Sequence, residues 1–142
     1  LRDVSGQGSG PVQAVKLDTG LLFVQTGKTR VMQTVYASDI LDYQTLHRTI
    51  LVPEIGEPSI ARMAVQRQPD TRVHCVRGDT EGTVAMLIDE PIEQVSAWID
   101  IASTAQQGFI EDVAVLPGAG LGEDQVYYIV RREINGSTLR YL

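Results

Sequence analysis

The sequence predicts an all-β fold made of three four-stranded repeats of about 50 residues. The dipeptide Ala-Val recurs at 14–15, 64–65 and 114–115, and each copy is followed by a loop, an apolar strand, a short turn and another strand. The second strand of each repeat is apolar on both faces, as in YYIV (127–130), instead of alternating with polar residues. Strands of this kind are typically covered on both sides, so each repeat is expected to form a sheet with two covered faces.

The repeated elements can be followed along the chain. The expected second strands are LLFV, VHCV and YYIV at 21–24, 73–76 and 127–130, and the third are RVMQTVY, TVAMLI and STLRYL at 30–36, 83–88 and 137–142. The turns between them carry Gly27, Gly82 and Gly136, which adopt positive φ at little cost. A fourth strand is predicted at 95–101 in the second repeat. In the first repeat, 38–51 could form a short helix opened by Ser38 and then a final strand.

The third repeat ends before a fourth strand could begin. Its last two strands read as a hairpin across Asn135-Gly136, the strongest short-range hairpin signal because both turn positions need positive φ. This leaves an unpaired strand edge at 137–142. Such an edge is a ready template for pairing with another strand, so it is the expected place for pairing between molecules or between repeats.

Four-stranded repeats at this pitch predict the blades of a β-propeller, which has 4–8 blades of ~40–50 residues. Three blades cannot close a ring, so the chain would form a partial propeller. A β-trefoil is the alternative, since three four-stranded repeats would then close on themselves with the N-terminal segment completing the last one. We expect one repeat domain over residues 1–142, with units at about 11–58, 59–108 and 109–142. The first residue is Leu, which suggests a fragment of a longer protein.

Composition excludes several classes of protein. A hydrophobic fraction of 43% and a charged fraction of 21% argue against disorder, and no apolar run approaches the roughly 20 residues that cross a bilayer. The net charge of −6 argues against a surface for sequence-specific nucleic-acid binding, and Arg131-Arg132 is too small a basic patch. One cysteine cannot form an internal disulfide.

No residue is predicted to be catalytic or to bind a cofactor or a metal. GAGLG (118–122) precedes a strand, whereas a dinucleotide fingerprint needs a following helix. His74 and Cys75 are adjacent in a strand and point to opposite faces, which favours a packed histidine and a buried thiol over a metal site. The approach of His47 to Cys75 as a nucleophilic pair stays open.

Acidic and aromatic residues are likewise expected to have structural roles. The acidic pairs are interpreted as solvated residues of turns and strand ends, although paired carboxylates also perform glycoside hydrolysis; they are Asp89-Glu90, Glu111-Asp112 and Glu123-Asp124. The aromatic residues are expected to pack between sheets, with a sugar-stacking platform as the alternative; they are Trp98 and Tyr36, Tyr43, Tyr127, Tyr128 and Tyr141. The loops at 67–70 and 118–124 occupy the same place in successive repeats, and SGQGSGP (5–11) reads as a flexible entry.

Three stretches resemble bacteriophage and prophage tail structural proteins, in the order in which that family has them. GLLFVQTGKTRVMQTVYASD resembles its LFV…G…V…Y segment, and MAVQRQPDTRVHCVRGDTEGTVAML resembles its Q-x-P-D…CVR-x-D-G…L segment. IEDVAVLPGAGLGEDQVYYIVRREINGSTLRYL resembles its VAV-x-P-G…DEV…V-R-R…I-N-G…RY segment. The resemblance runs from about Gly10 to Leu142 and is weakest over 38–58.

The chain is similar to the tail tubular B, or nozzle, type of short-tailed phages. The resemblance implies propeller-like β-structure and a non-enzymatic building block that assembles around the DNA exit channel. It implies a virion protein assembled in the bacterial cytoplasm, with copies of itself and other tail proteins as partners. It implies no catalytic residue, no cofactor and no membrane partner. A β module that binds host-surface glycan is the second hypothesis for function.

Overall fold

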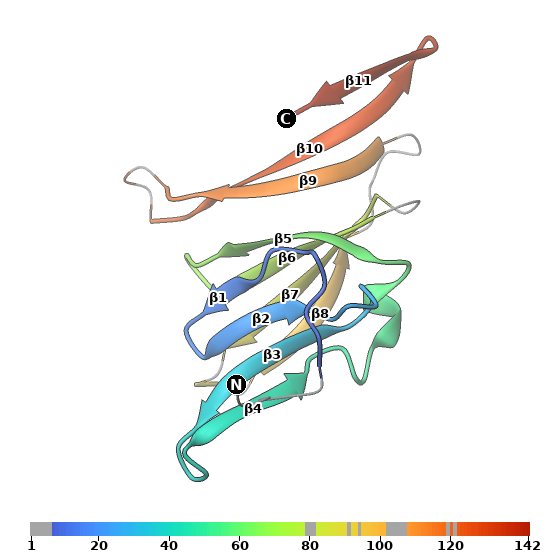
Figure 1. Cartoon of the computed structure of the whole chain (residues 1–142). Helices are drawn as coiled ribbons and strands as arrows, with labels where there is room; N and C mark the ends of the chain where they lie inside the picture. Colours follow the sequence, from blue (N-terminus) through green and yellow to red (C-terminus); the bar gives the residue numbers. More distant parts are fainter. Residues whose placement is uncertain are drawn as a thin grey trace.

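The computed structural model describes residues 7–78, 82–90, 92–93, 95–101, 108–118, 120 and 122–142. These residues form an all-β chain of three antiparallel sheets, and none of the sheets closes on itself (Figure 1). Each sheet is built from consecutive strands, in the orders β1-β2-β3-β4, β5-β6-β7-β8 and β9-β10-β11. The predicted all-β class is therefore confirmed, and the chain forms three successive sheets of four, four and three strands.

The strands of the three sheets have the following bounds. Sheet 1 contains β1 (Val15–Leu17), β2 (Gly20–Val24), β3 (Val31–Ala37) and β4 (Asp42–His47). Sheet 2 contains β5 (Ile60–Gln66), β6 (Arg72–Arg77), β7 (Val84–Glu90) and β8 (Val95–Ile101). Sheet 3 contains β9 (Gly108–Leu116), β10 (Gln125–Ile134) and β11 (Ser137–Tyr141). The fourth strand predicted at 95–101 is β8.

Sheet 2 lies between the other two sheets and packs against both. The larger core lies between sheets 1 and 2 and includes Leu22 and Val31 from sheet 1 and Val73 and Leu87 from sheet 2. The smaller core lies between sheets 2 and 3 and is formed by Val76, Val84, Ile110 and Val113. The first strands β1, β5 and β9 lie side by side in that order, which brings the three sheets together along one line (Figure 1).

The expectation that second strands are covered on both faces holds for sheet 2 and fails for sheet 3. In β6, Val73 and Cys75 lie in the larger core, while Val76 lies in the smaller one on the opposite face. Residues 126–131 of β10 are only half-buried, because no sheet covers the second face of sheet 3 in the part of the chain that the structure describes.

The predicted C-terminal hairpin is present. Ile134 pairs with Ser137 across the two-residue turn, in which Asn135 and Gly136 have φ of 50° and 74°. Gly82 also has the expected positive φ, at 57°. The expectation for Gly27 is wrong, because the neighbouring Lys28 takes the left-handed position of that turn, with φ of 63°.

The helix considered after Ser38 does not form. Residues 38–41 make a turn with Leu41 at φ of 52°, and β4 then pairs with β3 from Ala37↔Asp42 to Met32↔His47. Residues that favour β-structure alternate along β4, and the backbone of β4 pairs with the edge of β3, so this segment forms a strand instead of a helix. The helical segment that the structure does describe is a 3₁₀ helix, η1 (Pro53–Gly56), on the connection to sheet 2. No described helix is long and apolar enough to span a bilayer.

The Ala-Val step of 50 residues is not a structural repeat throughout. Val15 pairs with Leu22 and Val65 pairs with Val73, yet Leu22 and Val73 lie in the same core and so face each other. Equivalent residues of stacked sheets would face in the same direction. The match is therefore shifted by one residue in sheet 1.

The N-terminal Gly/Ser-rich segment is held against sheet 1 where the structure describes it. The N–H of Gly10 donates to the carbonyl of Val24 at 2.7 Å, and the N–H of Thr26 donates to the carbonyl of Gly8 at 2.9 Å. Ser9 forms an isolated bridge with Gln25. These residues extend the β1 side of β2 and do not complete sheet 3, as a trefoil would require. Residues 5 and 6 of the expected flexible entry lie outside the described part.

Candidate functional site

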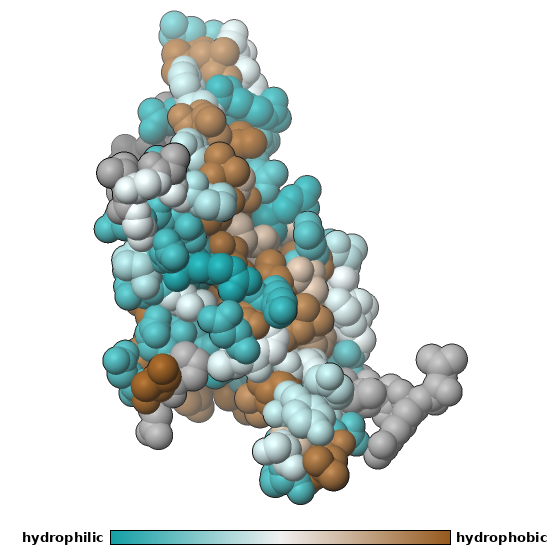
Figure 2. Space-filling view, turned by 90° about the vertical axis from the view of Figure 1, so that its left-hand side faces the viewer, coloured by the Kyte–Doolittle hydropathy of each residue, from teal (hydrophilic) through white to brown (hydrophobic). Residues whose placement is uncertain are grey.

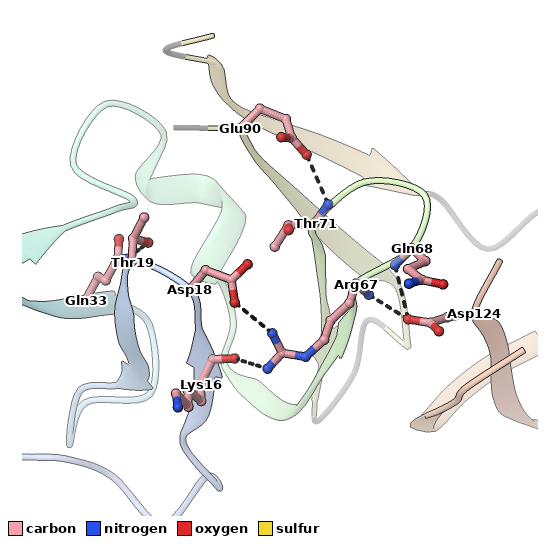
Figure 3. Close-up of polar contacts among 9 residues, drawn as sticks. All are labelled: Lys16, Asp18, Thr19, Gln33, Arg67, Gln68, Thr71, Glu90 and Asp124. Atoms are coloured by element: carbon pink, nitrogen blue, oxygen red, sulfur yellow. Dashed lines mark hydrogen bonds and ion pairs between the residues drawn. The ribbon is translucent and has the colours of Figure 1, made fainter. Parts of the chain in front are cut away.

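The loop between the first and second strands of sheet 2 makes polar contacts with the corresponding loops of sheets 1 and 3 (Figure 3). Arg67, after β5, donates from Nη1 to Oδ1 of Asp18 in sheet 1 at 3.1 Å and from Nη2 to the carbonyl of Lys16 at 2.9 Å. On the other side, the backbone N–H groups of Arg67 and Gln68 donate to Oδ2 of Asp124, at 2.7 and 3.2 Å. One loop of sheet 2 therefore joins its counterparts in sheets 1 and 3.

A pocket of about 290 Å³ lies beside this loop cluster, between sheets 1 and 2. Its lining includes three carboxylates, from Asp18, Asp89 and Glu90. All three are engaged within the fold: Glu90 accepts the N–H of Thr71 at 3.1 Å, Asp89 pairs with Arg48, and Asp18 pairs with Arg67. Among the described residues no group of three or more His, Cys, Asp or Glu is arranged to hold a metal ion.

Asp89 is not the solvated residue that the sequence predicts. Its side chain is 4% exposed and accepts a hydrogen bond from Nη2 of Arg48, on the far side of the larger core, at 3.1 Å. Arg48 also donates to Oε1 of Gln33 and to Oγ of Ser96. The indole N–H of Trp98 donates to the carbonyl of Arg48 at 2.9 Å. These contacts fix sheet 1 to sheet 2 and confirm that Trp98 packs between sheets.

Glu111 and Asp112 also form ion pairs with arginine side chains. Glu111 accepts from Nε of Arg140 at 2.7 Å and lies 3.5 Å from Nη1 of Arg131, and the hydrogen bond from Arg140 lowers the pKa of Glu111. Asp112 lies 3.7 Å from Nε of Arg62. A general acid needs a raised pKa, so the carboxyl of Glu111 is poorly suited to that role. Both carboxylates of this pair therefore lie beside arginine side chains.

His74 and Cys75 point to opposite faces of β6, as predicted. Nδ1 of His74 lies 2.7 Å from the hydroxyl of Tyr128 on sheet 3, and Nε2 lies 3.3 Å from Oε1 of Gln66. Burial, with a smaller contribution from the charge of Arg72, lowers the pKa of His74 from 6.5 to about 4. Neutral imidazole can then accept the hydroxyl proton of Tyr128 at one nitrogen and donate to Gln66 from the other.

Cys75 is unsuited to nucleophilic chemistry. It is fully buried in the larger core, and burial raises its pKa from 9.0 to about 12, so the thiol stays protonated. His47 does not approach it: Nε2 of His47 lies 3.1 Å from Oγ1 of Thr49 and faces a pocket of about 480 Å³. Partial burial and the charge of Arg30 lower the pKa of His47. The Cys-His pair left open by the sequence is not formed.

The burial of neutral His74 predicts a stability that depends on pH. Because the unfolded chain binds this proton near pH 6.5 and the folded chain only near pH 4, the stabilisation is present above about pH 6.5 and is lost as the pH falls. We expect the free energy of unfolding to fall by about 2 kcal/mol between pH 6.5 and about pH 5 from this group. Urea titrations of the protein and of His74→Gln test it: the variant should lose this part of the slope, and equal slopes would contradict it.

The exposed surface of sheet 3 carries arginine and aromatic side chains. The guanidinium of Arg131 lies 4.6 Å from the ring centre of Phe109, which is a cation–π geometry. These two residues, with Arg132, Glu133 and Gly136, line a pocket of about 450 Å³. Arg131 is also paired with Glu111, so Arg131-Arg132 does not form an extended basic surface.

The tyrosines divide between packing and exposure. Tyr128 packs edge-on against His74 between sheets 2 and 3, as predicted for aromatic residues in strands. Tyr36 and Tyr43 form an edge-to-face pair across β3 and β4, with ring centres 5.4 Å apart and more than half of each side chain exposed. The packing prediction is therefore wrong for this pair.

The comparisons with known proteins leave the family open. No protein-family model matches the chain, and a search of curated proteins finds no similar sequence.

The contacts that join the sheets were not predicted from the sequence. Arg48 is 41 residues from Asp89, and His74 is 54 residues from Tyr128, so no local motif marks either pair.

Proposed function

We propose that this chain is a non-enzymatic structural module that acts through protein–protein assembly. The observation that carries the proposal is the open side of sheet 3. All five residues of β11 are exposed, and its outer edge has no partner strand in the described part of the chain. Hydrophobic residues are exposed among hydrophilic ones along sheet 3, at the top of Figure 2.

The arrangement of the sheets supports a partial propeller as the architecture of this module. Three meanders, two of four strands and one of three, stack face to face, and their first strands lie side by side. The loops that join the first and second strands of each meander contact one another. In a propeller, successive blades repeat this relation around an axis. The stacked sheets leave one face of sheet 3 for a further blade, from the same chain or from another one.

The resemblance to bacteriophage tail proteins gives the proposal its biological setting. A tail component would assemble with copies of itself and with other tail proteins in the bacterial cytoplasm and remain in the virion. The contacts made by several acidic residues and by one histidine support a structural role over an enzymatic one. Glu111, Asp112, Asp89 and His74 all contribute to contacts within or between sheets.

Glycan binding is the second candidate, and the exposed pair Tyr36 and Tyr43 favours it. Aromatic faces on a surface can stack on sugar rings, whereas Trp98 is committed to the contact between sheets. Binding on a glycan array that disappears in Tyr36→Ala and Tyr43→Ala would support this function. Absence of binding on a broad glycan array would overturn the glycan-binding hypothesis.

The mass of the chain in solution tests the assembly proposal. Size-exclusion chromatography with light scattering over a concentration series should give a defined oligomer that dissociates on dilution. A monomer at every concentration would overturn self-assembly and would favour glycan binding as the function to be tested next.

A further inference from the structure

A pocket of about 480 Å³ lies on the face of sheet 1 that points away from sheet 2, where β3 begins and β4 ends beside η1 (Figure 1). Val31 points into the larger core, so the adjacent Met32 and its cross-strand partner His47 point away from it. The connection to sheet 2 completes the pocket with Ile50, Pro53 and Glu57. The volume falls within the range of small-molecule sites, roughly 300–1,000 Å³.

Arg30 lines this pocket and has no carboxylate partner among the residues that the structure describes. Of the other described arginines, all except Arg132 form an ion pair with a carboxylate. Glu57 lines the same pocket, yet within the described part of the chain its carboxylate does not pair with Arg30. The guanidinium of Arg30 therefore leaves its N–H donors available at the pocket.

His47 supplies a second donor beside Arg30. Oγ1 of buried Thr49 accepts the N–H of Val31 at 3.3 Å and lies 3.1 Å from Nε2 of His47. When the hydroxyl of Thr49 donates to Nε2, the neutral imidazole carries its proton on Nδ1, which no described residue accepts. Burial and then the charge of Arg30 lower the pKa of His47, so the guanidinium lies near enough to act on the imidazole.

We propose that this pocket binds a small organic carboxylate. The oxygens of the ligand are held by Arg30 and His47, because a guanidinium fork matches the two oxygens of a carboxylate. The apolar part of the ligand lies against Ile50 and Pro53; Ile50 is 65% exposed and offers apolar surface to cover. The carboxylate of Glu57 opposes a second negative charge, so the pocket suits a singly charged carboxylate better than phosphate. This binding function goes beyond the proposed assembly and does not depend on it.

Binding of the carboxylate and protonation of His47 favour each other. A carboxylate beside the imidazole offsets the charge of Arg30, so the ligand raises the pKa of His47. By linkage, the affinity for the carboxylate increases as the pH falls and His47 takes up its proton. Arg30 and Glu57 are the charged residues among those that line the pocket, and the remaining described lining residues carry no charge.

Benzoate is the probe, and the two histidines of the chain can be followed separately by proton NMR. In pH titrations of the whole chain, saturation with benzoate should raise the pKa of His47 and leave the signals of His74, between sheets 2 and 3, unmoved. Arg30→Gln should weaken benzoate binding by about tenfold or more, because it removes a charged hydrogen-bond donor. Arg132→Gln is the matched control: it removes the same charge from an exposed arginine of sheet 3 and should leave binding unchanged.

Two further probes separate the parts of the proposal. Benzyl alcohol lacks the carboxylate and inorganic phosphate lacks the apolar part, so neither should shift His47 at the concentration at which benzoate saturates it. A shift of equal size with phosphate or with benzyl alcohol would overturn the preference for an organic carboxylate. The absence of a saturable shift with benzoate, or an unchanged affinity in Arg30→Gln, would overturn the site itself. The assembly function is tested separately, by the mass of the chain in solution.

Discussion

Replacing Arg48 with methionine is expected to lower the free energy of unfolding by about 3 kcal/mol or more. Asp89 belongs to β7 of sheet 2 and is 4% exposed, and its carboxylate forms an ion pair with the guanidinium of Arg48 at 3.1 Å. Buried Gln33 would lose the donor to its Oε1 as well. Removing the cation of a buried ion pair leaves the carboxylate of Asp89 without its partner, which is strongly destabilising. Urea denaturation of Arg48→Met followed by circular dichroism measures the loss.

Arg67→Met is the matched control, because Arg67 also links sheet 2 to sheet 1 through an aspartate. That pair is open to solvent, with Asp18 82% exposed, so its removal should cost less than about 1 kcal/mol. Both variants exchange an arginine for an unbranched apolar side chain. Equal losses in the two variants would show that burial does not decide the strength of these contacts and would contradict the role given to Asp89.

Gly56→Ala is expected to destabilise the protein by about 3 kcal/mol, through a clash between two backbone segments. A Cβ atom on Gly56 would lie 1.7 Å from the carbonyl oxygen of Thr29 and 2.5 Å from its carbonyl carbon. Neither side can yield easily. Gly56 is the last residue of η1. The turn that contains Lys28 and Thr29 is held to sheet 2, because the N–H of Ile60 donates to the carbonyl of Lys28 at 2.8 Å. Thermal unfolding should show a lower midpoint.

Gly27→Ala, in the turn that Gly56 contacts, is the control for this substitution. No atom lies within 4 Å of a Cβ built at Gly27, and its φ lies outside the left-handed region. Its effect should be within about 0.5 kcal/mol of zero. If Gly56→Ala were equally mild, the connection between sheets 1 and 2 would be more pliable than its close contact with Thr29 implies.

The strands and the C-terminal hairpin could be predicted from the sequence because their signals are local. The turn at Asn135-Gly136 needs only the two residues that adopt positive φ, and β8 is marked by its own run of β-forming residues. The turn at Lys28 was missed because a neighbouring glycine gave the stronger local signal. The helix expected after Ser38 failed because pairing with β3 outweighs the local preference at the start of that segment.

The contacts between sheets could not be predicted, because they join residues far apart in the chain. Nothing near Asp89 distinguishes it from a solvated strand-end residue; its burial follows from Arg48 on another sheet. The same holds for His74, whose partner Tyr128 belongs to sheet 3. The shift of the Ala-Val repeat in sheet 1 was missed as well, because a two-residue match does not specify which face of the strand its residues occupy.

Assembly through the open edge of sheet 3 is tested most directly by amide hydrogen exchange of the unmodified chain at low and high protein concentration. The amide of Leu139 points to β10 and should be protected at both concentrations. The amides of Thr138 and Arg140 should exchange rapidly in dilute solution and at least about tenfold more slowly at high concentration, when a partner strand covers them. Rapid exchange of these two amides at both concentrations would contradict the account.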